Sequence, residues 1–177
     1  HLVYSQAAQM VAKQELDFTL PSRPQDAEQM LTEHIGKFSG ELKLFGIQDW
    51  YAPMASGSNP GDAMVVCPCT MGSLGKIANG IADDYLTTAV MACTAPKIVC
   101  PAMNVNMFQS PAVQENLLKL KSWGYRQVGP DAGDLACGVQ GLGRLATLTE
   151  IMEAMQELLT PQTLAGKRVL VTAGPTW

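Results

Sequence analysis

Two short segments of the chain carry side chains that are suited to chemistry. Asn104 closes the segment Pro101–Asn104, which follows an apolar run, and Cys137 stands next to Gly138 further along. Open α/β sheets hold their ligands at the carboxyl ends of the strands, so an amide at such an end is placed to contact one. An isolated loop cysteine is more often inert, but the glycines around Cys137 and the amide segment before it favour a functional thiol. Asn104 and Cys137 are therefore the first candidates for catalytic residues.

A third segment has the pattern of an anion site. Thr70, Met71, Gly72 and Ser73 follow the apolar run Met64–Cys67 and open a stretch with helical spacing. The first N–H groups of a helix lack partners within the helix, and the helix dipole also favours negative charge at that end. The pattern predicts either an anion-binding helix start or an ordinary helix cap.

The composition is that of one well-packed domain. Of the 177 residues, 47% are hydrophobic and 16% are charged, and the formal net charge is -4. The chain has no run of Lys and Arg, so nucleic acid is not expected as a partner. No apolar run approaches the ~20 residues that span a bilayer, and no signal-peptide pattern opens the sequence. We therefore expect a cytoplasmic protein without membrane contact.

The cysteines are expected to be reduced thiols, because their number is odd and the composition is otherwise that of an ordinary globular protein. Cys67 and Cys69 do not have the usual spacing of metal ligands, and the chain has only two histidines, so no structural zinc site is predicted. Apart from Cys137, we interpret the cysteines as small buried apolar side chains. These are Cys67, Cys69, Cys93 and Cys100.

Strand and helix patterns alternate along the chain, as is typical of a parallel α/β sheet. Strands are predicted at Met64–Cys67, where Pro68 ends the run, at Lys97–Cys100 and at Arg126–Val128. Residues 1–5 have the pattern of a strand end. Helical spacing occurs at residues 6–14, 70–82, 111–123 and 148–159, and more weakly at 27–35 within a polar connection.

Two further segments have characteristic patterns. Gly129–Arg144 is rich in glycine and has no hydrophobic period, which predicts a loop able to lie over a ligand. Lys167–Gly174 has the pattern of a strand followed by a glycine turn.

From about Ile81 to Trp177 the sequence resembles phosphopantothenoylcysteine decarboxylase, an FMN-dependent enzyme of coenzyme A biosynthesis. The similar segments are Asp83–Thr88, Pro101–Met107, Leu135–Gly138 and a tail, Leu164–Gly174, that is similar to the linker and first strand of a following synthetase domain. The resemblance implies that Met103 lies at the cofactor and that Asn104 holds the substrate carboxylate against the flavin. It also implies that Cys137 returns a proton and electrons to the decarboxylated intermediate.

Residues from His1 to about Gly80 resemble flavin prenyltransferase, which joins a dimethylallyl group to reduced FMN. The similar segments are His1–Ala8, Glu15–Phe18, Asp49–Trp50, Ala55–Ser58 and Cys67–Leu74. The resemblance implies that a set of residues contacts the cofactor or its prenyl pocket, and that Glu15 manages protons during alkylation. The contact residues are Ser5, Trp50, Ser56, Thr70, Met71, Gly72 and Ser73.

Both families belong to one FMN-binding superfamily, and together they imply the same frame. We expect FMN as cofactor and a three-layer α/β/α, flavodoxin-like parallel sheet that lacks its first strand and the phosphate turn after it. The expected division is an FMN-binding domain at residues 1–163 and a linker with the start of a strand at 164–177. A phosphorylated small-molecule substrate and a homo-oligomer, trimeric or dodecameric, also follow from the resemblance.

Three functions remain open at this point. Decarboxylation of phosphopantothenoylcysteine is preferred, because the amide segment and Cys137 both match that family. Prenyl transfer from dimethylallyl phosphate to FMN is the alternative, favoured by Glu15, Trp50 and Ser56. The third is a non-catalytic, FMN-binding oligomer that combines parts of both families.

Overall fold

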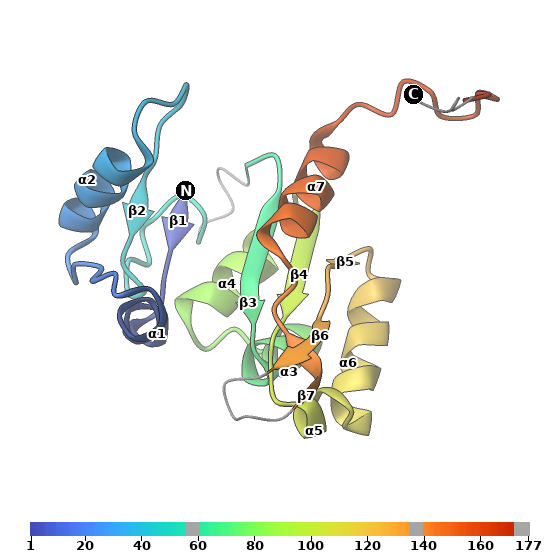
Figure 1. Ribbon diagram of the computed structural model, residues 1–177, viewed down its shortest axis with the longest axis horizontal. Helices are drawn as coiled ribbons and strands as arrows, with labels where there is room; N and C mark the ends of the chain where they lie inside the picture. Colours follow the sequence, from blue (N-terminus) through green and yellow to red (C-terminus); the bar gives the residue numbers. More distant parts are fainter. Residues whose placement is uncertain (56–60, 135–139, 172–177) are drawn as a thin grey trace, which may run out of the picture.

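A three-stranded parallel sheet forms the centre of the computed structural model, which describes residues 1–55, 61–134 and 140–171 (Figure 1). Its strands are β3 (Met64–Cys69), β4 (Lys97–Pro101) and β5 (Arg126–Gln127), in the order β3-β4-β5. Val66 is paired with Val99, and Val99 with Gln127. The predicted parallel α/β arrangement is therefore confirmed.

Helices cover both faces of this sheet. On one face, α3 (Met71–Ala78) and α6 (Pro111–Ser122) pack against Val66 and Val99. On the other face, α7 (Leu148–Leu159) packs against Ile98 and Cys100 through Ile151 and Ala154. Strands that are buried on both faces must be apolar at consecutive positions, which explains the unbroken apolar runs in the sequence. The expected three layers are present.

The N-terminal part forms a second parallel sheet. Strand β1 (Leu2–Val3) pairs with β2 (Leu44–Phe45), and α1 (Gln6–Leu16) and α2 (Pro24–Ile35) connect them. Val3 and Phe45 pack on Tyr85 and Ala89 of α4 (Tyr85–Ala92). In the described residues, the parallel strands thus divide into two sheets, which are joined by side-chain packing rather than by a hydrogen-bonded ladder.

Strand β3 continues through Pro68, which the sequence predicted to end it. The strand runs to Cys69, and the register with β4 shifts between Val66 and Cys69. Proline has no N–H to donate, so it fits a strand at a bulge, where the ladder is already interrupted. The extension carries β3 to the residue just before Thr70.

The glycine-rich segment 129–144, predicted as a loop, contains an antiparallel hairpin of β6 (Asp131–Asp134) and β7 (Gln140–Arg144). The hairpin packs on the short helix α5 (Val105–Phe108). A Cβ on Gly141 would lie 2.8 Å from Cγ2 of Val105, so glycine permits this close approach. The prediction was wrong because the strands form through contact with α5, and their own residues have little strand propensity.

The C-terminal segment after α7 does not form the predicted strand within the described residues. Residues 167–171 have no strand assignment, and Leu170 and Val171 are 89% and 83% exposed. Strand propensity alone does not make a strand without a neighbour to pair with. Separately, no helix in the described ranges has the length and apolarity needed to cross a bilayer.

Gly129 should be required for the connection between β5 and β6. Its φ is +74°, and a Cβ there would lie 2.9 Å from Cβ of Ala146. Gly129→Ala should lower the free energy of unfolding by about 1 kcal/mol for the left-handed backbone and by about 1–3 kcal/mol more for the clash. Urea unfolding measures the loss.

Gly124→Ala is the matched control, because φ is +85° and nothing lies within 4 Å of the added Cβ. This variant should show only the smaller, backbone part of the loss. Equal losses for the two variants would contradict a role for the contact with Ala146.

Candidate functional site

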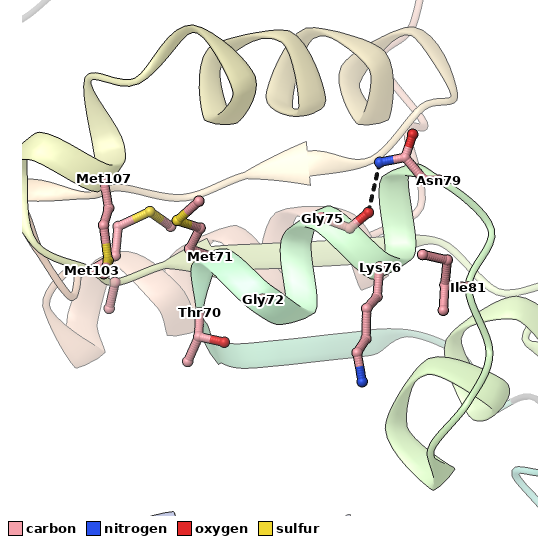
Figure 2. Close-up of a pocket in the computed structure, with 10 residues that line it drawn as sticks. Thr70, Met71, Gly72, Gly75, Lys76, Asn79, Ile81, Met103 and Met107 are labelled. Carbon is pink, nitrogen blue, oxygen red and sulfur yellow. Dashed lines mark hydrogen bonds between the residues drawn. The ribbon is translucent and has the colours of Figure 1, made fainter.

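A cavity of about 800 Å³ lies where β3 and β4 end (Figure 2). One wall is α3, and the other is the segment that leads from β4 into α5. The carboxyl ends of adjacent parallel strands are the usual ligand position in open α/β sheets. The lining residues are Thr70, Met71, Gly72, Gly75, Lys76, Asn79, Ile81, Ala102, Met103 and Met107.

One face of α3 supplies the first wall. Residues three, four and seven positions apart share one side of a helix. Counted from Gly72, these positions are Gly75, Lys76 and Asn79. The Nδ2 group of Asn79 donates a 2.8 Å hydrogen bond to the carbonyl of Gly75 (Figure 2). The residues Gly75, Lys76 and Asn79 were not predicted to line a site, although their helical spacing was a signal that could have identified them.

The start of α3 carries backbone donors toward the cavity. Thr70 is the N-cap, and its Oγ1 accepts a 3.3 Å hydrogen bond from the N–H of Ser73. The N–H groups of Met71 and Gly72 belong to the first turn, so they have no acceptor within the helix. Together with the helix dipole, these groups give this end of the cavity a preference for anionic or carbonyl oxygens.

Three methionines surround the same end of the cavity. Figure 2 shows the side chains of Met71, Met103 and Met107 close to one another, from α3 on one side and from the β4–α5 segment on the other. The N–H of Met103 donates a 2.9 Å hydrogen bond to the carbonyl of Gly143, so β7 fixes its backbone. Flexible thioethers pack well against aromatic rings, and this surface therefore fits a flat aromatic ligand.

Asn104 follows Met103 and begins α5. Its Oδ1 accepts a 2.8 Å hydrogen bond from the N–H of Asn106, and the side chain is half-buried. This bond fixes the orientation of the amide oxygen, although Asn104 is not among the residues that line the cavity. Asn104 is the sequence neighbour of a lining residue, Met103.

Lys76 is the charged residue among those that line the cavity, and two carboxylates compensate it. Its Nζ lies 2.7 Å from Oδ1 of Asp83 and 2.9 Å from Oδ2 of Asp84. Hydrogen bonds from Lys76 to Asp83 and to Asp84 raise the pKa of Lys76. Partial burial raises the pKa of Asp84, but hydrogen bonds from Thr87 and Lys76 outweigh it, so the net pKa is lowered.

The other residues proposed from the sequence lie apart from this cavity or outside the described structure. Ser5 caps α1 and accepts a 3.1 Å hydrogen bond from the N–H of Ala8. The ring of Trp50 packs edge-on against Tyr85 at 6.3 Å between centroids. Glu15 belongs to α1, but its side chain is outside the described structure, and Ser56 and Cys137 lie outside the described residues.

Comparison with known proteins settles the family. The profile of the Flavoprotein family matches residues 1–160. The chain belongs to the Flavoprotein family. The coenzyme A biosynthesis bifunctional protein CoaBC of Bacillus subtilis is 46% identical over 118 residues, which are 65% of this chain and 29% of that protein. The flavin prenyltransferase UbiX of Pseudomonas aeruginosa is 36% identical over 124 residues, 70% of this chain and 59% of UbiX.

Solved structures agree with this assignment. A PPC decarboxylase mutant complexed with pantothenoylaminoethenethiol has a TM-score of 0.62 at 28% identity, covering 68% of this chain and 72% of that one. The FMN binding protein AtHal3 has a TM-score of 0.50 at 35% identity, covering 55% and 54%. The resemblance to both FMN-dependent families is confirmed. This chain spans 29% of the length of the CoaBC proteins that it matches.

Asp84 should contribute a stability that depends on pH. It caps α4 through a 2.8 Å hydrogen bond from the N–H of Thr87, and loss of such a cap costs about 1 kcal/mol. Because the pKa of Asp84 is lowered from 3.8 in the folded state, its contribution is complete above that value and is lost as pH falls through the folded-state pKa. Asp84→Ala should therefore be less stable than the parent at pH 7 and should approach it in acid.

Urea unfolding from pH 7 down to pH 3 measures this difference. Asp83→Ala is the matched control, because Asp83 pairs with the same Lys76 at an exposed position but does not cap the helix. The free energy of unfolding of this control should fall by at most about 1 kcal/mol. A difference between Asp84→Ala and the parent that stays constant with pH would contradict the assignment.

Proposed function

We propose that this chain is the FMN-binding part of a flavoenzyme that decarboxylates a cysteine-derived substrate, with phosphopantothenoylcysteine as the preferred one. The observation that carries the proposal is a methionine-lined cavity that meets the start of a helix, with Asn104 directly after the lining residue Met103. An amide, an apolar surface for a flat ring and a set of backbone donors are the elements that such a reaction needs in one place.

The residues of the cavity fit FMN. Its volume, about 800 Å³, lies within the roughly 300–1,000 Å³ of ligand pockets. Gly72 has no side chain at the start of one wall, so a ring system can approach the backbone of α3 there. Met71, Met103 and Met107 would contact the ring, and the N–H groups of Met71 and Gly72 would meet its oxygens. When bound, FMN supplies the two-electron thiol oxidation that makes the carboxylate easier to lose.

The chain's own groups would orient the substrate and move the proton. The Nδ2 group of Asn104 would donate to the substrate carboxylate, while its Oδ1 stays bonded to the N–H of Asn106. Positioning of this kind is worth much of a catalytic rate, because small displacements of a bound group are costly. Cys137 would return the proton to the decarboxylated product, as the resemblance implies.

The comparisons support decarboxylation more than prenyl transfer. CoaBC of Bacillus subtilis is 46% identical, against 36% for UbiX of Pseudomonas aeruginosa. The solved PPC decarboxylase holds pantothenoylaminoethenethiol, a decarboxylated thiol. Prenyl transfer is the second candidate, favoured by the matching segments around Ser5, Glu15 and Trp50. FMN binding without either turnover would identify the third candidate, a non-catalytic flavin-binding protein.

We further propose that the chain assembles as a homo-oligomer, a trimer or a dodecamer. The rim of the cavity exposes apolar side chains, with Met71 39%, Ile81 46% and Met107 48% exposed. Apolar groups that border a ligand site are typical of a surface that a partner covers. A second copy would cover this rim and close the cofactor site.

FMN binding should depend on the absence of a side chain at Gly72, near the start of α3. Gly72→Leu should lower FMN affinity by at least about tenfold, because the new side chain would enter the cavity, and within 4 Å of the added Cβ only Oγ1 of Thr70 lies, at 4.0 Å. Visible absorption and fluorescence titration with FMN measure the affinity. Ala112→Leu, at an exposed position of α6, is the control and should bind FMN as the parent does.

Loss of FMN affinity in both variants, or in neither, would contradict the assignment of FMN to this cavity. The readout is binding rather than turnover, so it stays informative if neither reaction occurs.

Decarboxylation should require the amide of Asn104. Asn104→Asp keeps the oxygen that caps α5 but replaces the donor group by a charge that repels the substrate carboxylate, so turnover should fall by about 10²-fold or more with FMN retained. Release of carbon dioxide and mass spectrometry of the thiol product measure the turnover. Asn106→Ala serves as the control in the same turn.

Cys137→Ser should likewise retain FMN and lose turnover.

Turnover that survives Asn104→Asp would rule out the proposed role. If the parent instead converts FMN to a product heavier by one prenyl group, the second candidate is the function.

A further inference from the structure

Three thiols lie close together where β3 and β4 end, and the proposed decarboxylation uses none of them. Cys69 and Cys100 are completely buried, whereas Cys67 is exposed. All three are free in the structure. In the described part of the chain, no group of three or more potential ligands could hold a metal ion, so a metal site does not explain the cluster.

The pairing of β3 with β4 places two of the three thiols, Cys67 and Cys100, next to each other, and the third, Cys69, on the opposite face of the sheet. Val66 is paired with Val99, so Cys67 and Cys100 are the next residues on their strands. Neighbouring strands lie about 4.8 Å apart, which is within the range of Cα separations, about 4.4–6.8 Å, that a disulfide can bridge. Cys100 belongs to the core under α7, whereas Cys69 belongs to the core under α3 and α6, on the opposite face of the sheet.

The two thiols of the pair differ in reactivity. The hydrogen bond from Cys100 lowers the pKa of Cys67 from 9.0 to about 7, although partial burial opposes this shift. That same hydrogen bond, together with burial, raises the pKa of Cys100, and burial raises the pKa of Cys69 to about 12. An exposed thiol with a pKa near the ambient pH is the most effective attacking group in thiol–disulfide exchange.

We propose that Cys67 and Cys100 are a reversible dithiol–disulfide pair, with low-molecular-weight disulfides as the oxidant. The thiolate of Cys67 attacks one sulfur of the small disulfide, which breaks its S–S bond and releases one small thiolate. The released thiolate takes the proton of Cys100, and the resulting thiolate of Cys100 attacks Sγ of Cys67, which releases the second small thiolate. The net reaction oxidises two protein thiols to one disulfide and reduces one small disulfide to two thiols.

The pair lies directly below both walls of the cavity. Strand β3 ends at Cys69, immediately before Thr70, and β4 ends at Pro101, two residues before Met103. The N–H of Ala102 donates a 3.2 Å hydrogen bond to the carbonyl of Cys69, which connects the ends of the two strands. A disulfide between Cys67 and Cys100 would add a covalent link at this level, between the strands that carry the two walls.

Peptide mapping by mass spectrometry after treatment with oxidised glutathione tests the proposal. The full chain is incubated with the disulfide at neutral pH, blocked with N-ethylmaleimide and digested without reductant. The expected product is a peptide pair linked through Cys67 and Cys100, which dithiothreitol separates again. A linkage of Cys67 to another cysteine, or no modification at Cys67, would overturn the proposal.

Two variants separate the steps. Cys100→Ser should stop at a glutathione adduct on Cys67, because the second attack cannot occur. Cys67→Ser should take up no glutathione at this site, and it changes an exposed side chain, which leaves the core intact. Cys93→Ser is the control and should form the linked pair as the parent does. An adduct that persists on Cys67 in the parent would show that Cys100 does not resolve it, and would also overturn the proposal.

Discussion

The parallel pairing of β3 with β4 is the constraint on which the rest of the structure depends. The ladder from Met64 to Val66 against Lys97 to Val99 places the two strand ends side by side. Strand β3 leads into α3 at Thr70, and β4 leads toward α5 through Met103. These two segments form the two walls of the cavity. The packing of α6 on α3 and of α7 on the opposite face buries Val66 of β3 and most of β4, which stabilises this pair of strands.

The β6–β7 hairpin completes the second wall from outside the sheet. The carbonyl of Gly143 accepts a hydrogen bond from the N–H of Met103, and Gly141 packs against Val105. The segment with Met103 and Asn104 is thus held by β4 on one side and by β7 on the other. Such a support from both sides is what a substrate-orienting amide requires, because its capping bond to Asn106 is useful only if the turn itself does not move.

The parts of the fold that the sequence predicted well are those whose burial is strongest. Residues 148–159 were expected to be helical and form α7, whose start is fixed by the reciprocal hydrogen bonds of Thr147 and Glu150. The apolar runs at β3 and β4 were equally clear, because both faces of these strands are covered. By contrast, α3 ends at Ala78, earlier than its expected end at residue 82, since Gly80 has a φ of +68° and breaks the helix.

The parts that were missed depend on contacts between distant segments. Residues 131–134 and 140–144 contain three glycines, and only their contact with α5 makes them strands. The candidate site shows the same division. Thr70, Met71, Gly72 and Met103 were named from local motifs and line the cavity, whereas Met107 and Ile81 belong to it only because the two walls face each other.

The charges around the cavity indicate how it would select an anion. Lys76 is the cation among the lining residues, but its ammonium group already forms ion pairs with Asp83 and Asp84. A bound anion would therefore gain little from that side chain, and the backbone N–H groups at the start of α3 become the main attraction. Backbone donors are fixed in direction and lose no side-chain entropy on binding. Recognition at this end of the cavity thus depends on the position of the helix start, and that position follows from the extension of β3 to Cys69.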